Sequence, residues 1–177
     1  MSQDPLGLAS GTVTVVPYDD RWIGLFDEAS LEIANALGSA ILAVHHVGST
    51  SVPGLHAKPI LDILVSIPAF PRGLALVPRL ASLGYEFRSA EEIPDRHYFR
   101  RLRGRVRTHH LSLAEPASHH YRVTIAFRDA LRASPSLAAE YGALKLRLAR
   151  QFPRDRQAYI EGKTTFISRV LAAKINV

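Results

Sequence analysis

The residues best suited to chemistry lie in one short stretch, residues 46–65. There an apolar approach ends in a tight turn of small residues, Gly48, Ser49, Thr50 and Ser51. The backbone N–H groups and hydroxyls of such a turn can donate hydrogen bonds to phosphate oxygens. The apolar run after the turn contains Asp62, and a lone carboxylate there is costly unless it is paired or holds a metal ion. The stretch therefore predicts a site for a polyphosphate and a metal ion.

Lysine and arginine side chains elsewhere are candidates to bind the phosphates. Lys58 follows the turn, while Lys145 and Lys163 belong to the C-terminal third of the chain. Lysines in such positions are most often on the surface, and the alternative is that they reach a triphosphate. Arg100 comes from a basic segment and could bind substrate phosphate through its guanidinium group.

Other catalytic patterns are weak in this sequence. Ser49 and Ser51 lack the Gly-x-Ser-x-Gly pattern of a serine nucleophile, and the glycines do not have the spacing of a P-loop. Histidines occur in adjacent pairs at 109–110 and 119–120. Adjacent side chains of a strand point to opposite faces, so each pair offers at most one ligand to a zinc site.

Position 64 bears on the predicted metal ion. In a strand over residues 60–67, Asp62 and Leu64 share a face because side chains alternate. A site for two metal ions would need its second carboxylate at position 64. The leucine found there weakens the prediction of metal-dependent catalysis.

The composition is that of a globular protein, with 177 residues of which 47% are hydrophobic and 21% charged. No apolar run approaches the roughly 18 residues needed to span a membrane. Cysteine is absent, which excludes disulfides and agrees with a cytoplasmic location. Residues 1–12 lack the basic and apolar regions of a signal peptide. We predict a cytoplasmic protein with a disordered tail over residues 1–12 and a single domain over residues 13–177.

The elements that position these residues are predicted from periodicity and capping. Apolar residues at helical spacing indicate a helix that begins after Asp19 and Asp20 and is closed by Gly38. Ser134 and Pro135 are typical of an N-cap and a first helical turn. Strands are predicted at 13–17, 41–47, 60–67 and 85–87, helices at 71–83, 120–133 and 154–175, an acidic loop at 89–95, and a hairpin at 97–113.

The predicted hairpin is the most basic segment, with arginines at positions 100, 101, 103, 105 and 107. The net charge of +6 also comes mostly from arginine. A solvated hairpin tip is one interpretation, and attraction of an anionic ligand or of RNA is the other. Tyr98 and Phe99 could stack on bases, although no RNA-binding motif is present.

A longer ordered set of short motifs is much more specific. It comprises Val16–Trp22 (VPYDDRW), His46–Leu55 (HVGSTSVPGL), Lys58–Ile63 (KPILDI), Thr108–Leu111 (THHL), Phe127–Asp129 (FRD), and Tyr141 with Leu144 and Lys145. By these motifs the chain resembles the GrpB family from about residue 13 to its end. The resemblance implies an α+β fold similar to that of the nucleotidyltransferase superfamily: a small mixed sheet flanked by helices, with a helical C-terminal portion.

The resemblance also implies roles for single residues. Gly48 and Ser49 match the turn that holds the triphosphate in nucleotidyltransferases. Asp62 matches their first Mg²⁺ carboxylate. His110 matches the first histidine of the family's usual His-Leu-His, as a metal ligand or a base.

The chain departs from this pattern at two positions. Leu64 stands where active nucleotidyltransferases have their second carboxylate, and Ser112 stands in place of the second histidine. A site with one carboxylate and one imidazole holds less positive charge against a triphosphate than a two-metal site does. If there is catalysis, part of the missing stabilisation would come from Lys58, Arg100 or Lys163.

The resemblance leaves different functions open. The first is Mg²⁺-dependent transfer of a nucleotidyl group from a nucleoside triphosphate to a small acceptor. The second is a non-catalytic module that binds a nucleotide or a coenzyme A-like molecule, because a GrpB-like domain is fused behind dephospho-coenzyme A kinase in some bacteria. RNA binding by the arginines of the hairpin is the third.

Overall fold

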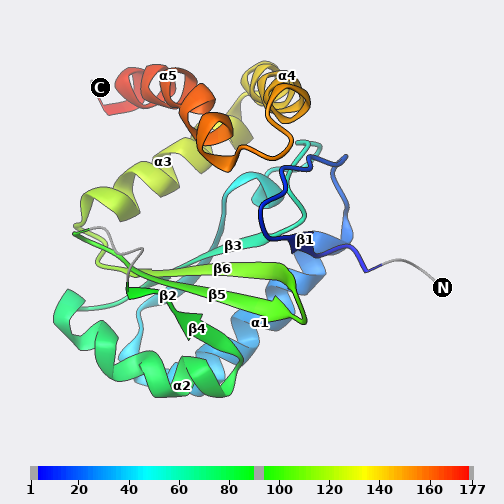
Figure 1. The fold of residues 1–177 in the computed structure, drawn as a ribbon. Helices are drawn as coiled ribbons and strands as arrows, with labels where there is room; N and C mark the ends of the chain where they lie inside the picture. Colours follow the sequence, from blue (N-terminus) through cyan, green and yellow to red (C-terminus); the bar gives the residue numbers. More distant parts are fainter. Residues whose placement is uncertain (1–3, 90–93, 176–177) are drawn as a thin grey trace.

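The chain has a mixed α+β fold, which a computed structural model describes for residues 4–89 and 94–175. A sheet lies between α1 and α2 on one side and α3, α4 and α5 on the other (Figure 1). The helices are α1 (Arg21–Leu37), α2 (Val77–Ser82), α3 (His119–Ala133), α4 (Pro135–Gln151) and α5 (Arg156–Ile175). The strands are β1 (Leu8–Ala9), β2 (Ala43–Val47), β3 (Leu61–Ser66), β4 (Tyr85–Phe87), β5 (His97–Arg103) and β6 (Val106–Ala114). This architecture confirms the fold class predicted from the sequence.

The register of the sheet aligns the candidate residues. Within the described residues the sheet has six strands, in the order β2-β3-β6-β5-β4, with β1 paired to β6. β3 and β6 are parallel, and the other pairs are antiparallel. Asp62 of β3 lies opposite His110 of β6, which lies opposite Arg100 of β5. Three residues that the sequence singled out therefore form one row across the sheet.

One face of the sheet is covered by α1 and α2 and forms the main core. Helix α1 buries its apolar stripe at helical spacing, Trp22, Ala29, Ile33 and Leu37, as predicted. Against it pack the alternate strand residues Ile63, Val65, Phe99, Leu111 and Leu113. Burying each large side chain of this kind contributes about 1.5–3 kcal/mol, so this core fixes the register of the central strands.

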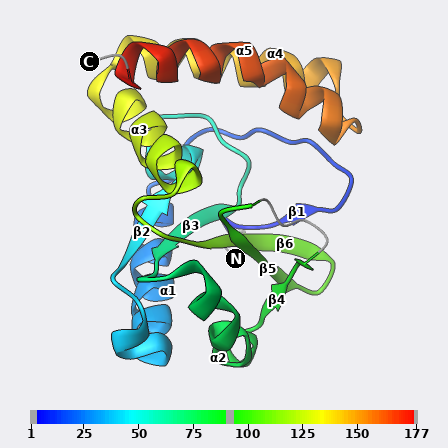
Figure 2. The same cartoon turned by 90° about the vertical axis from the view of Figure 1, so that its left-hand side faces the viewer.

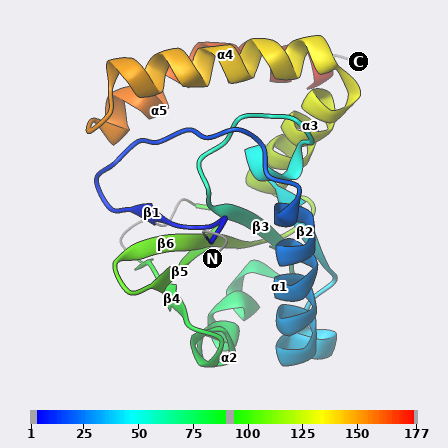
Figure 3. The same cartoon turned by 90° about the vertical axis from the view of Figure 1, so that its right-hand side faces the viewer.

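The other face of the sheet is covered only in part. Val47 and Leu64 contact Tyr121 and Ile125 of α3. Helices α4 and α5 pack on α3 and on the loop after the Gly48–Ser51 turn. Figures 2 and 3 show them as a layer beyond the sheet, with α3 connecting the two. Asp62 of β3 and His110 and Ser112 of β6 lie on this side.

The N-terminal region differs from its prediction. A strand was expected at 13–17, yet only Val16 forms an isolated bridge, with Ala57. Residues 4–12 of the expected tail are packed on the fold: Leu8 belongs to β1 and pairs with β6. The reason is apolar burial, because Leu6 packs against Trp22 in a small core. Residues 1–3 lie outside the described residues.

One predicted helix is divided into two parts in the structure. The helix expected over 71–83 is a 3₁₀ segment, Phe70–Leu76, followed by α2. Pro78 occupies the first turn of α2, the helical position at which its missing N–H costs least. Residues 90–93 of the acidic loop lie outside the described residues.

Within the described part of the chain, no helix is long and apolar enough to cross a membrane.

Candidate functional site

The Gly48–Ser51 turn is built around Asp62. Gly48 has a φ of +68°, a conformation that glycine adopts without strain. A Cβ atom at this position would lie 2.8 Å from the Asp62 Cβ and closer still to its carboxylate. Only glycine lets the backbone of the turn come this close to β3. The glycine predicted to hold phosphate is therefore also required for the packing of the aspartate.

Two of the turn's hydroxyls are used inside the protein. The buried Thr50 Oγ1 is 3.0 Å from His46 Nε2, and Ser51 Oγ donates to the Gly48 carbonyl at 2.6 Å. Burial lowers the pKa of His46 to about 4, so its ring is neutral. These contacts hold the shape of the turn. Ser49 and Thr50 of the turn line a hollow together with Asp62 and His110.

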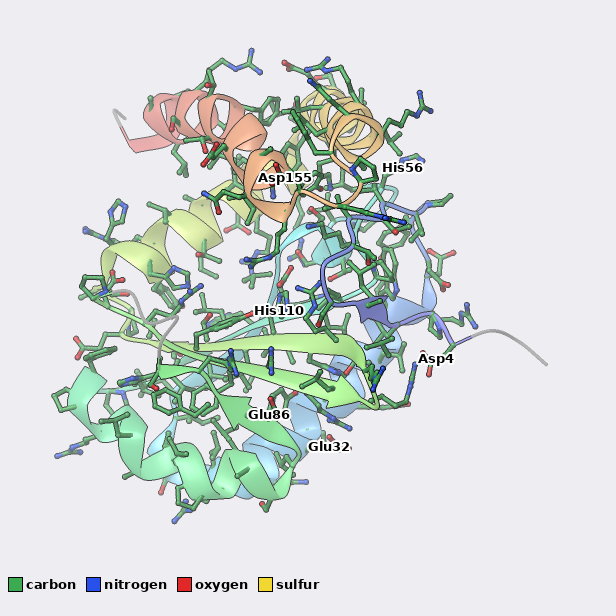
Figure 4. The ribbon with its side chains drawn as sticks, viewed as in Figure 1. Asp4, Glu32, His56, Glu86, His110 and Asp155 are labelled. Atoms are coloured by element: carbon green, nitrogen blue, oxygen red, sulfur yellow. The ribbon has the colours of Figure 1, made fainter. Side chains whose placement is uncertain are left out.

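Asp62 and His110 form the polar pair at the centre of the site. Their side chains meet with Asp62 Oδ1 at 3.0 Å from His110 Nδ1. The side chains are 40% and 22% exposed, so both can reach a ligand. Figure 4 shows His110 on the side of the sheet that faces α3 and α5. The parallel pairing of β3 and β6 produces this contact, since the two residues are directly opposite.

Three lysines, which we call the lysine cluster, surround this pair: Lys58, Lys145 and Lys163. With Ser49, Asp62, His110 and Tyr159 they line one hollow of about 100 Å³. Lys145 is 2% exposed and donates from Nζ to Ser49 Oγ at 2.7 Å and to the His56 carbonyl. Lys58 and Lys163 lie over the ring of Tyr159, 4.0 and 4.7 Å from its centroid. The cluster thus joins α4, α5 and the loop before β3 around the turn.

The lysine cluster sets three amines against one carboxylate, that of Asp62, which lines the same hollow. Burial and the neighbouring cations lower the pKa of Lys58 and of Lys145 to about 7, and burial lowers that of Lys163 as well. Among the residues that the structure describes, no Asp or Glu forms an ion pair with any of the three amines. Desolvated cations are costly unless an anion compensates them. The hollow is therefore suited to an anionic ligand.

The residues present fit one magnesium ion but not a pair. Asp62 can share an ion with ligand phosphates, which is the usual way in which Mg²⁺ is held in nucleotide sites. Leu64 is 1% exposed and packs under α3, so position 64 offers no second carboxylate. Across residues 4–89 and 94–175, no group of three or more His, Asp or Glu side chains is placed to hold a metal ion. A two-metal centre has no ligand set here.

The arginines of the β5–β6 hairpin, positions 100, 101, 103, 105 and 107, which we call the arginine hairpin, lie apart from this hollow. Arg100 shares the row of Asp62 and His110, but its Nε donates to Glu86 on β4 at 3.0 Å. Arg101 pairs with Glu32 of α1 at 3.0 Å, and Arg103 pairs with Asp4. Arg100 does not line the hollow of the lysine cluster, so the structure does not bring it to the predicted phosphate site.

Tyr159 was not among the predicted site residues, and Lys145 was expected either on the surface or at a triphosphate. A signal for Lys145 was present in the sequence, because Tyr141, Lys145 and Leu148 follow one another at helical spacing and all three are buried. A lysine within an apolar stripe is rarely buried without a partner. Tyr159 is a core residue of α5, and its ring also lies under the amines of two of the lysines.

Sequence comparisons identify a family and several relatives. The family model described as "GrpB protein" matches residues 12–173. The chain is 36% identical over 155 residues to UPF0157 protein YqkA of Bacillus subtilis, covering 88% of this chain and 45% of YqkA. It is 39% identical over 162 residues to UPF0157 protein PA4798 of Pseudomonas aeruginosa, covering 90% and 66%. The chain thus spans less than two thirds of the length of these relatives. A 28% identical match covers 88% of this chain and 44% of a dephospho-CoA kinase of Mycolicibacterium paratuberculosis.

Structural comparisons agree with this assignment. The crystal structure of the conserved protein GrpB from Enterococcus faecalis matches with a TM-score of 0.83 and 32% identity, covering 90% of this chain and 96% of that chain. The Cid1 poly(U) polymerase, in a structure with MgGTP bound, matches with a TM-score of 0.52 and 16% identity, covering 77% and 44%. This second likeness concerns the fold alone, and it confirms the predicted similarity to nucleotidyltransferases.

Proposed function

The chain belongs to the GrpB family, and on that premise we propose that it binds a nucleoside triphosphate or a coenzyme A-like phosphate ester. The phosphates lie against the Gly48–Ser51 turn, where the lysine cluster neutralises their charge. The observation that carries the proposal is a set of three desolvated lysines whose hollow, among the described residues, is lined by a single carboxylate, Asp62, and by no ion pair to any of the three amines. A protein that only needed stability would bury apolar side chains in those positions.

The chemistry of the hollow supports phosphate more than other anions. Lysine amines, a serine hydroxyl and the backbone of a glycine turn are common donors to phosphate oxygens. The hollow of about 100 Å³ is smaller than the pockets that enclose whole drug-sized ligands, so it suits phosphate groups rather than a complete nucleotide. The MgGTP of the Cid1 structure and the name of the dephospho-CoA kinase relative motivate the two ligand classes.

A ligand panel followed by calorimetry tests the proposal. The panel consists of ATP, GTP, CTP, UTP, coenzyme A and dephospho-coenzyme A, each with MgCl₂ and with EDTA. A ligand present at 100 times its dissociation constant stabilises the native state by about 2.7 kcal/mol, which raises the melting temperature measurably. We expect at least one triphosphate or coenzyme A compound to bind with EDTA present, because the lysines supply the charge.

Variants of matched chemistry identify the residues responsible. Lys163→Met keeps the length and apolar stem of the side chain but removes its charge, and we expect affinity to fall roughly 10- to 100-fold. Arg147→Met removes a positive charge from an exposed position of α4 that does not line the hollow and serves as the control. The proposal is wrong if no phosphate ester in the panel binds. It is also wrong if the Lys163→Met and Arg147→Met variants bind the ligand equally well.

Nucleotidyl transfer is the second candidate, and the Asp62–His110 contact favours it. A neutral His110 that donates Nδ1–H to Asp62 keeps Nε2 as a proton acceptor. An acceptor oxygen would bond to the α-phosphorus while the bond from that phosphorus to the bridging oxygen breaks. Diphosphate leaves, and the acceptor's proton passes to His110. A Mg²⁺ ion held by Asp62 and the phosphates would add positive charge near the leaving group.

The release of diphosphate from the triphosphate distinguishes nucleotidyl transfer from binding alone. ³¹P NMR of ATP or UTP with the protein, Mg²⁺ and a mixture of small hydroxylated acceptors should show diphosphate if transfer occurs. Asp62→Asn should abolish this signal and leave binding measurable, because the lysines remain. Binding without diphosphate release from any triphosphate would leave a binding module as the function.

A further inference from the structure

A second hollow lies against the same Asp62–His110 pair. It measures about 260 Å³ and shares those two residues with the hollow of the lysine cluster. Its other lining includes residues that do not line the first hollow: Ser112 of β6, Thr124 of α3 and Arg156 at the start of α5. A molecule bound in it would touch the same pair as the phosphates do, without contacting Lys58, Lys145 or Lys163.

The second hollow is also cationic. Arg96 and Arg156 line it, and the guanidinium of Arg96 lies 4.7 Å from the centroid of the Tyr98 ring. Asp62 is the one acid among its described lining residues. His120 lines it too, and burial lowers the pKa of His120 to about 4, so this ring offers a hydrogen bond and no charge at pH 7.

The chemistry of this lining favours a small hydroxylated anion. Two guanidinium groups form charge-assisted hydrogen bonds with a carboxylate or a phosphate. The hydroxyls of Ser112 and Thr124 suit hydroxyl groups of a ligand, and His110 lies beside them. A nucleoside is neutral and would form no charge-assisted hydrogen bond of this kind. The volume is below that of pockets for drug-sized ligands, which favours a small molecule.

We infer that the second hollow binds a small hydroxylated phosphate or carboxylate and presents its hydroxyl to Asp62 and His110. The inference deepens the proposed function, because the small anion would lie beside the phosphate ester bound at the lysine cluster. It rests on the proposed function for the identity of that phosphate ester. Binding of the anion to Arg96 and Arg156 is a property of the second hollow alone. It can be measured whether or not a nucleotide binds.

Two-dimensional NMR of the ¹⁵N-labelled protein tests the inference. The probes are glycerol 3-phosphate and glycerate, one for each source of negative charge, and glycerol as the neutral control. Each is titrated into the free protein and into protein saturated with ATP. We expect saturable shifts of the Ser112 and Thr124 amide signals with one or both anionic probes, and none with glycerol.

Arginine variants locate the binding. Arg156→Gln should weaken the probe roughly tenfold, because it removes a charge-assisted hydrogen bond. Arg154→Gln removes the charge of an exposed neighbour that does not line the hollow, and it should bind as wild type does. Arg96→Gln is the second variant and should resemble Arg156→Gln. ATP affinity is measured in each variant, because Arg156 also lowers the pKa of Lys58 and Lys163.

The outcomes separate this inference from the proposed function. If ATP and the other phosphate esters fail to bind while a probe binds in an Arg156-dependent way, the proposed function fails and the second anion site stands. The inference is overturned if neither probe binds, or if binding depends on Lys163 instead of Arg156. It is also overturned if ATP alone shifts Ser112 and Thr124 and excludes the probes, because the hollow would then hold the nucleoside.

Discussion

The lysine cluster and the arginine hairpin are the two basic regions of the molecule, and they differ in what balances their charge. In the arginine hairpin, Arg100 pairs with Glu86 and Arg101 with Glu32. Arg103 pairs with Asp4 and also donates to the Leu6 carbonyl at 2.7 Å. The amines of the lysine cluster meet a hydroxyl, a carbonyl and aromatic rings, and within the described residues they meet no carboxylate in an ion pair.

The difference shows that local density of charge is a poor guide to ligand binding. The hairpin is the denser region in the sequence, yet its arginines fasten β5 and β6 to β4, to α1 and to the N-terminal segment. Such exposed pairs contribute little to stability and have their charge neutralised by neighbours. The lysines are few and far apart in the sequence, but the fold brings them together in a partly dehydrated hollow. An anion gains most where no internal partner competes for the cations.

The largest contrast should come from the glycine of each region. Gly48→Ala would push a Cβ atom into Asp62 at a positive φ. We expect the free energy of unfolding to fall by roughly 2–4 kcal/mol. Binding of the phosphate ester should be lost as well. Gly104→Ala in the hairpin turn, at φ +58° and with no atom within 4 Å of the new Cβ, should cost about 1 kcal/mol. Urea unfolding measures both. Equal losses of unfolding free energy in the two variants would mean that the packing of Asp62 on the turn does not contribute to stability.

The second contrast is pH dependence. An anion is bound by the protonated amines, and the pKa of Lys58 and of Lys145 is about 7 in the free protein. From pH 7 to 8 the protonated fraction of each falls, so affinity for the ligand should weaken roughly fivefold for each lysine that must carry its proton. Calorimetry at pH 6.5, 7, 7.5 and 8 provides the measurement.

A charge that does not titrate is the control for this profile. Lys58→Arg keeps a positive charge at every pH used. The affinity of this variant for the ligand should therefore fall less steeply with pH, by the contribution of one lysine. An affinity that is flat from pH 6.5 to 8 in the wild-type protein would contradict the role of these amines.

The fold could largely be predicted because each element carries its own signal. The alternation of residues 60–67 and the helical spacing from Trp22 to Leu37 identify a buried strand and a one-sided helix. The hairpin turn at Gly104 and the Ser134 cap of α4 also follow from local chemistry. Burial of Leu6 was missed, since it depends on a contact with Trp22 that no local pattern encodes.

The site was harder to predict because it depends on register and on packing between distant segments. The contact of Asp62 with His110 requires β3 and β6 to be parallel neighbours, and the sequence pointed to His110 only through a family resemblance. Arg100 was expected at the phosphates, but the β4–β5 register places Glu86 opposite it. Lys145 was taken for a surface residue, although its spacing from Tyr141 and Leu148 puts it on the buried face of α4.

Replacement of the buried Lys145 should change the stability less than Gly48→Ala does, and it should increase the stability. The folded pKa of Lys145, about 7, is below its ordinary value of 10.5, so the unfolded chain binds the extra proton between these pH values. Stability of the wild-type protein therefore rises with pH over that window. Lys145→Met should be more stable by about 1 kcal/mol at pH 7, where the buried charge is costly, and this advantage should fade towards pH 10. Thermal unfolding at both pH values tests it, and a destabilised variant at pH 7 would assign Lys145 a purely structural role.

The smallest effects should come from the arginine hairpin. Arg101→Met removes a partly exposed ion pair with Glu32, so unfolding free energy should fall by about 1 kcal/mol or less. Affinity for the phosphate ester should stay within about twofold of wild type, because Arg101 lies outside the hollow and surface charges are screened by salt. Calorimetry at 0.15 M salt compares Arg101→Met with Lys163→Met directly. Equal losses of affinity in the two variants would mean that total positive charge, and not the absence of a carboxylate partner, determines where the anion binds.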